Sequence, residues 1–123
     1  MPAPGKQNLL KERSYAFALR TIKLYKHLSG ESKEYVLSKQ ILRSGTSIGA
    51  NITEANRGES RMDFVHKLSI ALKEADETEY WLNLLRDGDY ITASQAESLL
   101  TDCSQLQRLL IASIKTTKAN LTK

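Results

Sequence analysis

The chain has 123 residues, enough for one domain of ordinary size, and its 41% hydrophobic and 26% charged residues are typical of a globular protein. Its single cysteine excludes an intrachain disulfide, and no run of about 18 apolar residues is present, so we expect a cytoplasmic protein with no membrane association. The net charge of +4 is uneven, because residues 1–59 hold ten Lys/Arg against five Asp/Glu whereas residues 60–90 hold four against seven. This asymmetry suits either an anionic partner or self-association.

Two apolar runs at helical spacing occupy the first half of the chain. The first begins at Asn8, a candidate N-cap, and ends at Gly30, a residue that favours helix termination. The second begins at Ser32, again a candidate N-cap, and fades near Gly58. Each run therefore predicts one separate helix.

Two further runs occupy the second half. The third begins at Ser60, with Asp63 three residues later, and ends near Gly88. The fourth begins at Thr92, with Gln95 in the position that completes a reciprocal capping box. These two runs predict two more helices.

The lengths of the four runs determine the simplest packing. Each spans about 20 to 26 residues, or about 30 to 39 Å at the helical rise. Connections of about two to six residues leave antiparallel neighbours as the simplest arrangement. We therefore predict an all-α protein, a single up-down-up-down antiparallel four-helix bundle over residues 1–123, with residues 1–7 as a flexible N-terminal tail.

Basic side chains recur on the first two predicted helices, where they could contact phosphate groups. The alternative is a solvated face whose charges only confer solubility. The candidate nucleic-acid-binding residues are Arg13, Arg20, Lys23, Lys26, Lys39 and Arg43. Aromatic side chains could stack on unpaired bases, but at helical spacing we expect most of them to pack as half-buried core. These are Tyr15, Tyr25, Tyr35, Tyr80 and Tyr90.

A stripe of short polar side chains lies beside the apolar face of the second predicted helix. It contains Ser47, Asn51 and Glu54, whose spacing places them on one side of the helix. Such side chains need hydrogen-bond partners when partly buried, and a neighbouring helix, another subunit or a ligand would each supply them. Glu54 and Arg57 are also spaced so that they could pair with each other.

Gly45 and Gly49 lie four residues apart in the same predicted helix. Glycine in a helix interior costs about 1 kcal/mol relative to alanine, so we expect the pair to permit close approach by another helix. Two tolerated glycines in a well-supported helix are the alternative. The letters from Gly45 to Gly49 also match the Gly-x-Ser-x-Gly nucleophile elbow, but that elbow follows a strand, so we interpret the match as coincidence.

A longer pattern joins the second and third predicted helices. It consists of Ser47-Ile48, Asn51-Ile52, Glu54, Arg57, Ser60, Phe64, Leu68, Ala71, Glu77 and Tyr80-Trp81-Leu82. As a set, this spacing resembles the family of small four-helix-bundle proteins encoded by intervening sequences in bacterial 23S ribosomal RNA genes, over about residues 19–85. The chain departs from the family pattern at Ala55, where glycine is frequent, and at Lys73-Glu74, where Gly-Ser is frequent.

The resemblance implies a bundle that assembles into a homo-oligomer, with a ring of five subunits suspected, and no established enzymatic activity. It also implies a link to RNA, because a related bundle is an accessory to retroelement reverse transcriptases. We assign family-motif or assembly roles to six of the residues: Ser47, Asn51, Glu54, Arg57, Glu77 and Trp81.

Residues suited to catalysis or metal binding form no recognisable pattern. Asp63 and His66 have the spacing of one half of a di-iron ligand set, but the sequence lacks a second carboxylate-x-x-His. We therefore expect no catalytic residue, no metal and no cofactor.

Two functions remain open from the sequence. The first is a non-enzymatic oligomeric bundle that binds structured RNA or a ribonucleoprotein through its basic first and second helices. The alternative is a structural assembly module, without nucleic-acid binding, that recognises a protein partner. In that case the acidic third helix around Trp81 could meet a basic helix of another copy.

Overall fold

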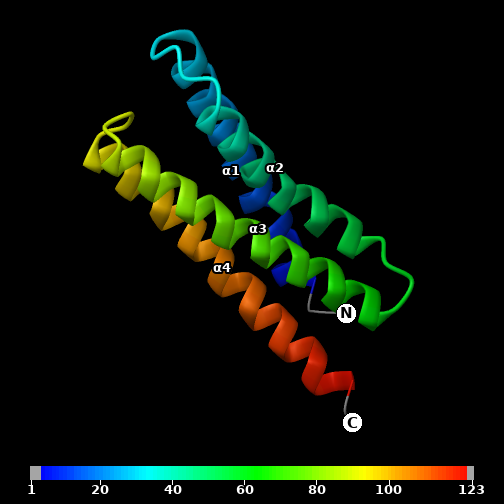
Figure 1. The fold of residues 1–123 in the computed structure, drawn as a ribbon. Coiled ribbons are helices and arrows are strands. Elements are labelled where there is room, and N and C mark those ends of the chain that lie inside the picture. The colour runs from blue at the N-terminus through cyan, green and yellow to red at the C-terminus, as the bar shows by residue number, and fades with distance from the viewer. Residues whose placement is uncertain (1–3, 122–123) are drawn as a thin grey trace.

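The computed structural model describes residues 4–121, with the side chains of residues 9–121. Four helices account for nearly all of this range, and they form the predicted antiparallel four-helix bundle (Figure 1). Their bounds are α1 Pro4–Gly30, α2 Leu37–Asn56, α3 Arg61–Asp87 and α4 Ala93–Leu121. Among these helices, none combines the length and apolar character needed to cross a membrane.

Each helix packs against two neighbours. α1 contacts α2 and α4, and α3 also contacts α2 and α4, so the four helices surround one common core. The turns at 31–36 and 88–92 lie at one end of the bundle, and the α2–α3 turn lies at the other end with both chain termini (Figure 1). Two of these contacts matter below: the α1–α4 seam, where the first and last helices meet, and the α2–α3 seam between consecutive helices.

The core is built from apolar side chains on the inward face of every helix. Phe17 on α1, Ile48 on α2 and Phe64 on α3 are fully buried, and Leu106 joins them from α4. The buried face of α2 is the predicted one, because residues of the second apolar run at i, i+4 and i+7, such as Ile41, Gly45 and Ile48, face the interior. Burial of these side chains is the main stabilising contribution, at about 1.5 to 3 kcal/mol for each.

The first helix begins earlier than predicted. α1 starts at Pro4, so Asn8 is not its N-cap and the predicted tail is wrong for residues 4–7. Proline suits the first turn of a helix because its φ is already helical and its missing N–H would have no intrahelical partner there. Residues 1–3 of the predicted tail lie outside the described residues.

The second helix begins later than predicted. Lys33 has a φ of 56°, a left-handed conformation that separates α1 from α2, so Ser32 is not the N-cap. The N-cap is Val36, and the carboxylate of Glu34 satisfies the first N–H groups, because it accepts hydrogen bonds from Val36, Leu37 and Ser38 at 2.7 to 3.1 Å. Burial alone would raise the pKa of Glu34, but these donors outweigh it and lower the pKa below the usual 4.5.

The other two helix starts are confirmed. The hydroxyl of Ser60 accepts a hydrogen bond from the N–H of Asp63 at 3.1 Å. At α4, the N–H of Thr92 donates to Gln95 at 2.9 Å and the N–H of Gln95 donates to the Thr92 hydroxyl at 3.1 Å. Both caps satisfy donors that a helix leaves without intrahelical partners.

The glycines of α2 allow α1 to approach closely, as predicted. A Cβ added to Gly45 would collide with the side chain of Thr21, and one added to Gly49 would lie 3.3 Å from the hydroxyl of Ser14. Glycine at these two positions therefore allows α1 and α2 to pack closely along about one turn of α2.

Candidate nucleic-acid interface

The two predicted RNA-contacting arginines of α1 are bonded to α4. Arg20 forms an ion pair with Asp102 at 2.6 Å and donates a hydrogen bond to the Ser98 hydroxyl at 2.9 Å. Arg13 donates to the side-chain oxygen of Gln105 at 2.7 Å. These arginines connect two helices, so binding a phosphate would compete with contacts that they already make.

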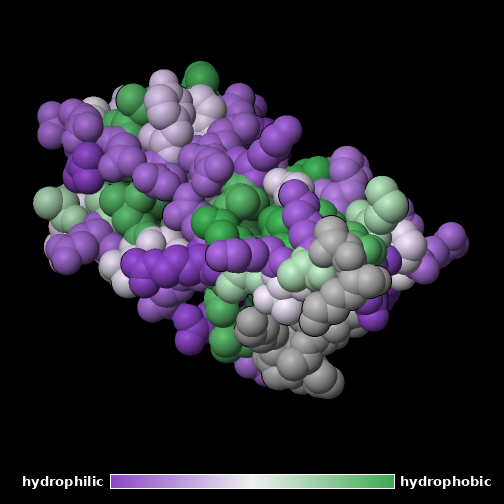
Figure 2. All heavy atoms as spheres, turned by 90° about the horizontal axis from the view of Figure 1, so that it is seen from below, coloured by the Kyte–Doolittle hydropathy of each residue, from purple (hydrophilic) through white to green (hydrophobic). Residues whose placement is uncertain are grey.

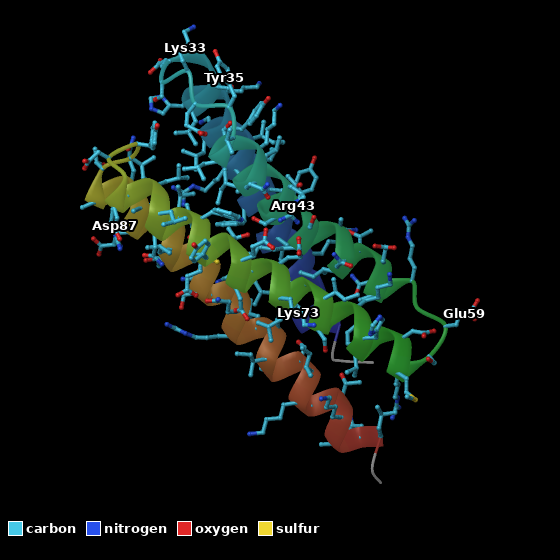
Figure 3. All side chains as sticks on the ribbon, viewed as in Figure 1. Lys33, Tyr35, Arg43, Glu59, Lys73 and Asp87 are labelled. Carbon is cyan, nitrogen blue, oxygen red and sulfur yellow. The ribbon has the colours of Figure 1, made fainter. Side chains whose placement is uncertain are left out.

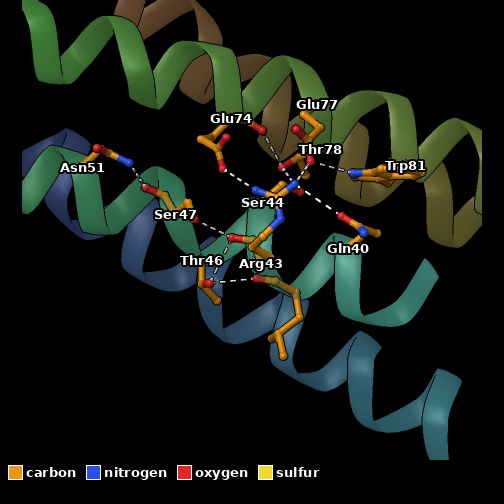
Figure 4. Close-up of polar contacts among 11 residues, drawn as sticks. Gln40, Arg43, Ser44, Thr46, Ser47, Asn51, Glu74, Glu77, Thr78 and Trp81 are labelled. Carbon is orange, nitrogen blue, oxygen red and sulfur yellow. Dashed lines mark hydrogen bonds and ion pairs between the residues drawn. The ribbon is translucent and has the colours of Figure 1, made fainter. Parts of the chain in front are cut away.

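Arg43 has the same role at the α2–α3 seam (Figure 4). It forms ion pairs with Glu74, at 3.1 Å, and with Glu77, and it donates a hydrogen bond to Gln40 at 3.4 Å. Glu77 also accepts a hydrogen bond from the indole N–H of Trp81 at 3.0 Å. The guanidinium therefore lies within a network that already compensates its charge, midway along the bundle (Figure 3).

The three predicted lysines differ from the arginines. Lys23, Lys26 and Lys39 are exposed, and among the described side chains none makes a hydrogen bond or ion pair with them. Lys23 and Arg20 line a small hollow of about 330 Å³ between α1 and α4. The structure thus distributes the six predicted residues over two seams and the outer surface instead of one continuous face.

The polar stripe of α2 mostly bonds to its own helix. The hydroxyl of Ser47 donates to the Arg43 carbonyl at 2.6 Å, and the amide of Asn51 donates to the Ser47 carbonyl at 2.9 Å. Glu54 contacts Lys67 of α3 at 3.4 Å, which makes α3 its partner instead of Arg57. Ser47 and Asn51 are therefore satisfied without a ligand.

A second polar contact lies deeper in the α2–α3 seam. The hydroxyl of Thr78 donates to the hydroxyl of Ser44 at 2.9 Å, and both side chains are fully buried (Figure 4). This hydrogen bond places α2 in register with α3 beneath the Arg43 network. Glu77 and Trp81, assigned to the family motif, therefore take part in polar contacts between α2 and α3 of the same chain.

The expectation that most tyrosines are half-buried core is wrong. Tyr15, Tyr35, Tyr80 and Tyr90 are exposed, and only Tyr25 is half-buried. Tyr35 projects at the 31–36 turn, beside Lys33 (Figure 3). At the end of the molecule that holds the α2–α3 turn, apolar side chains also reach the surface between polar ones (Figure 2). The surface thus offers more apolar area than the sequence pattern predicted.

A second hollow follows the outer side of α1 and α2, and we name it the α1–α2 valley. It has a volume of about 840 Å³ and is lined by Tyr15, Ala18 and Leu19 on α1 and by Gly49, Ala50 and Thr53 on α2. The sequence did carry a signal for it, because Tyr15, Leu19 and Ile22 recur at i, i+4 and i+7 on the side of α1 opposite its buried residues.

The described residues hold no group of three or more His, Cys, Asp or Glu side chains that could bind a metal ion. Cys103 is buried and its thiol donates to the carbonyl of Ala75 at 3.3 Å. Burial, with smaller contributions from Glu79 and Asp76, raises the pKa of Cys103 to about 12. A thiol in this state is a poor nucleophile at neutral pH.

Comparisons with known proteins agree with this architecture. Residues 6–112 match the model of the family described as 23S rRNA-intervening sequence protein. A solved structure of a protein of unknown function from the S23 ribosomal protein family of Bacteroides thetaiotaomicron is similar, with 58% sequence identity and a TM-score of 0.89 over 89% of this chain and 98% of that one. No match was found among curated proteins. The chain belongs to the 23S rRNA-intervening sequence protein family.

Proposed function

We propose that this protein is a non-enzymatic bundle that binds RNA through phosphate contacts on α1 and the adjoining face of α2. The observation that carries the proposal is the surplus of positive charge on α1. Residues 4–30 contain six Lys/Arg and one Glu, for a net charge of +5. Cations concentrated on one helix attract a polyanion and release its counterions on binding.

The lysines support this function better than the arginines do. Arg13, Arg20 and Arg43 already bond to neighbouring helices, so using them for phosphate would break existing contacts. Lys23, Lys26 and Lys39 have no such contacts among the described side chains. An exposed, unpaired lysine can bind a phosphate without that competing loss, so these three carry the proposed phosphate contacts.

The test is a titration of a labelled structured RNA, followed by fluorescence anisotropy at several salt concentrations. The key variant combines Lys23→Glu, Lys26→Glu and Lys39→Glu. A matched control combines Lys73→Glu, Lys115→Glu and Lys118→Glu, which changes the net charge equally at exposed positions on α3 and α4. We expect the first variant to lose affinity and its salt slope to fall by roughly 2 to 3, since each lost phosphate contact removes about 0.7 to 0.9.

Equal losses in both variants would mean that only net charge matters, and the assignment to α1 and α2 would fail. Absence of binding by the wild-type protein even at about 50 mM salt would remove RNA binding altogether.

Self-assembly is the second candidate, with a homo-oligomer and a ring of five subunits as its expected form. Exposed apolar side chains occur both on α1, at Leu19, and on α3, at Tyr80 and Leu84. Residues 60–90 carry a net charge of −3, with four Lys/Arg against seven Asp/Glu, so the α3 surface complements the basic α1 surface. Two different complementary faces on one chain favour a heterologous contact, which closes into a ring when the rotation permits.

The native mass, measured by light scattering, tests the second candidate. Asp76→Lys with Glu79→Lys should lower the mass, and adding Lys26→Glu with Lys39→Glu in the same chain should restore it, because both faces then change sign. A monomeric wild-type protein at all concentrations would reject self-assembly.

A further inference from the structure

We propose that the α1–α2 valley binds unpaired nucleotides of single-stranded RNA, with Tyr15 as the platform on which a base stacks. The proposal rests on the proposed function, and it adds the type of RNA and the residue that recognises it. Tyr15 is 69% exposed, and beside it Leu19 is 50% and Ile22 is 36% exposed. An aromatic ring held open next to apolar side chains offers a favourable surface for a flat, apolar base face.

The valley is open because of the small residues beneath it. Gly49 packs against Ser14, and Gly45 packs against Thr21, so α1 and α2 lie close together. The hollow of about 840 Å³ falls within the range of about 300 to 1,000 Å³ that is typical of small-molecule sites. There is therefore room for more than one base in contact with Tyr15.

One cationic residue lines the valley, and others lie along the same two helices beyond its two ends. Lys11 lines it, one turn before Tyr15, and the exposed Arg57, at the C-cap of α2, comes four residues after Thr53. At the other end, Lys26 follows Ile22 by one turn and Lys39 precedes Thr46, a lining residue, by two turns.

Helix geometry separates these two cationic ends. The 15 residues from Lys11 to Lys26 correspond to about 22 Å along α1. The lining itself holds one basic residue, Lys11, and one acidic residue, Glu12, so the positive charge that attracts phosphates comes from the cationic residues beyond the hollow. An exposed aromatic ring with cationic side chains on the same surface is an arrangement that proteins use for single strands.

The chemistry of the valley favours a single strand over a duplex. In an A-form duplex the base faces are stacked on each other, so only phosphates and hydroxyls would reach the valley and its apolar walls would stay uncovered. An unpaired base can leave the strand, cover Tyr15 and Leu19 and leave its phosphates near the cationic ends. This combination satisfies both the apolar and the charged parts of the surface.

The test compares a 12-nucleotide oligouridine with an RNA duplex of the same length, by anisotropy at one fixed salt concentration. The variants are Tyr15→Leu and Tyr15→Phe, with Tyr90→Leu as the matched control at another exposed tyrosine. We expect Tyr15→Leu to weaken binding of the single strand by roughly 5- to 150-fold, the range measured for one stacked base, while duplex binding stays the same. Tyr15→Phe should retain the affinity, and Tyr90→Leu should have no effect.

A direct readout accompanies the affinities. Oligouridine that carries 4-thiouridine should crosslink on irradiation to residues of the valley, with Tyr15 among them, and excess unlabelled oligouridine should suppress the crosslink. Crosslinks confined to other faces would overturn the proposal. So would equal losses of single-strand and duplex binding in Tyr15→Leu.

The outcomes separate this inference from the proposed function. Steep salt dependence with no effect of Tyr15→Leu would leave phosphate binding intact and reject the stacking site. Binding that depends on Tyr15 but not on the three lysines would reject the proposed phosphate contacts and keep the stacking site. A changed native mass in Tyr15→Leu would mean that another copy of the chain covers the valley, and that result also overturns the inference.

Discussion

Arg43 of α2 and Glu77 of α3, 34 positions apart in the sequence, form an ion pair across the seam between the two helices. The same carboxylate accepts the indole N–H of Trp81, and the same guanidinium contacts Glu74. The side chain of Arg43 is 50% exposed and that of Glu77 is 34% exposed, so solvent weakens the attraction between their charges. The ion pair therefore fixes the position of α2 relative to α3 more than it adds to the free energy of unfolding.

Replacing Glu77 should separate these two effects. Glu77→Gln removes the negative charge that both Arg43 and Trp81 contact, and we expect the free energy of unfolding to fall by less than about 1 kcal/mol. The emission of Trp81, the single tryptophan of the chain, should shift because its indole loses a charged acceptor. Urea unfolding and tryptophan fluorescence measure the two quantities.

Glu74→Gln is the control for that experiment, because it removes an Arg43 partner and leaves the acceptor of Trp81 in place. Its emission should match the wild type. A loss of several kcal/mol in Glu77→Gln, or the same emission in all three proteins, would contradict this account of the seam.

Adding one methyl group at Gly45 should destabilise the α1–α2 packing. The new Cβ would overlap the side chain of Thr21, which is fully buried and cannot move aside. We expect Gly45→Ala to lower the free energy of unfolding by about 1 to 3 kcal/mol, although alanine alone favours the helix by about 1 kcal/mol. Thermal or chemical unfolding followed by circular dichroism measures the loss.

Two further variants make the result specific to that contact. Gly30→Ala places a methyl group in open space at the end of α1, so it should change stability little. Thr21→Ser removes the methyl group that lies nearest to the new Cβ, so it should recover part of the loss when combined with Gly45→Ala. Equal effects of Gly30→Ala and Gly45→Ala would show that the overlap is not the cause.

The Glu34 cap predicts a dependence of stability on acid pH. Because the pKa of Glu34 is lower in the folded protein than its usual 4.5, the folded state favours the ionised carboxylate. Its contribution is therefore complete above about pH 4.5 and is lost as the pH falls through the folded pKa. Glu34→Gln should remove this part of the acid dependence and cost about 0.5 to 2 kcal/mol at neutral pH, as expected for a lost cap.

Unfolding monitored between pH 3 and pH 7 compares the two proteins. Glu31→Gln, in the same turn but outside the α2 cap, is the control, and its curve should follow the wild type more closely than that of Glu34→Gln. Parallel curves for the wild type and Glu34→Gln would exclude Glu34 as the source of the dependence.

The thiol of Cys103 should resist modification in the folded protein. Its side chain is fully buried, and its pKa of about 12 leaves almost no thiolate at pH 8. We expect a thiol reagent such as DTNB to label Cys103 only as fast as the protein opens, and to label it at once in about 6 M guanidinium chloride. Rapid labelling of the native protein would show that the α3–α4 packing opens at this position.

Features that depend only on residues close together in the chain can be predicted from the sequence. The caps at Ser60 and Thr92 each need only a partner three residues later in the chain, so the residue types at these positions predict them. The buried faces of α2 and α3 follow from helical periodicity for the same reason. The sequence alone does not place the start of α2, because Ser32 and Glu34 could both cap a helix that begins there. The left-handed conformation of Lys33 separates α1 from α2 and leaves Glu34 as the capping side chain.

The candidate site depended on residues far apart in the chain. A basic side chain has the same letter whether it faces solvent or an acidic residue on another helix, so the sequence did not separate Arg20, paired with Asp102, from Lys23. The α1–α2 valley likewise requires the lateral packing of two helices, which leaves Tyr15 exposed. Amino-acid order alone determined the four helices and the buried faces of α2 and α3, because helical periodicity and capping act within a few residues. Tertiary packing decided which charges are compensated and which apolar side chains stay open, because both depend on what the neighbouring helix presents.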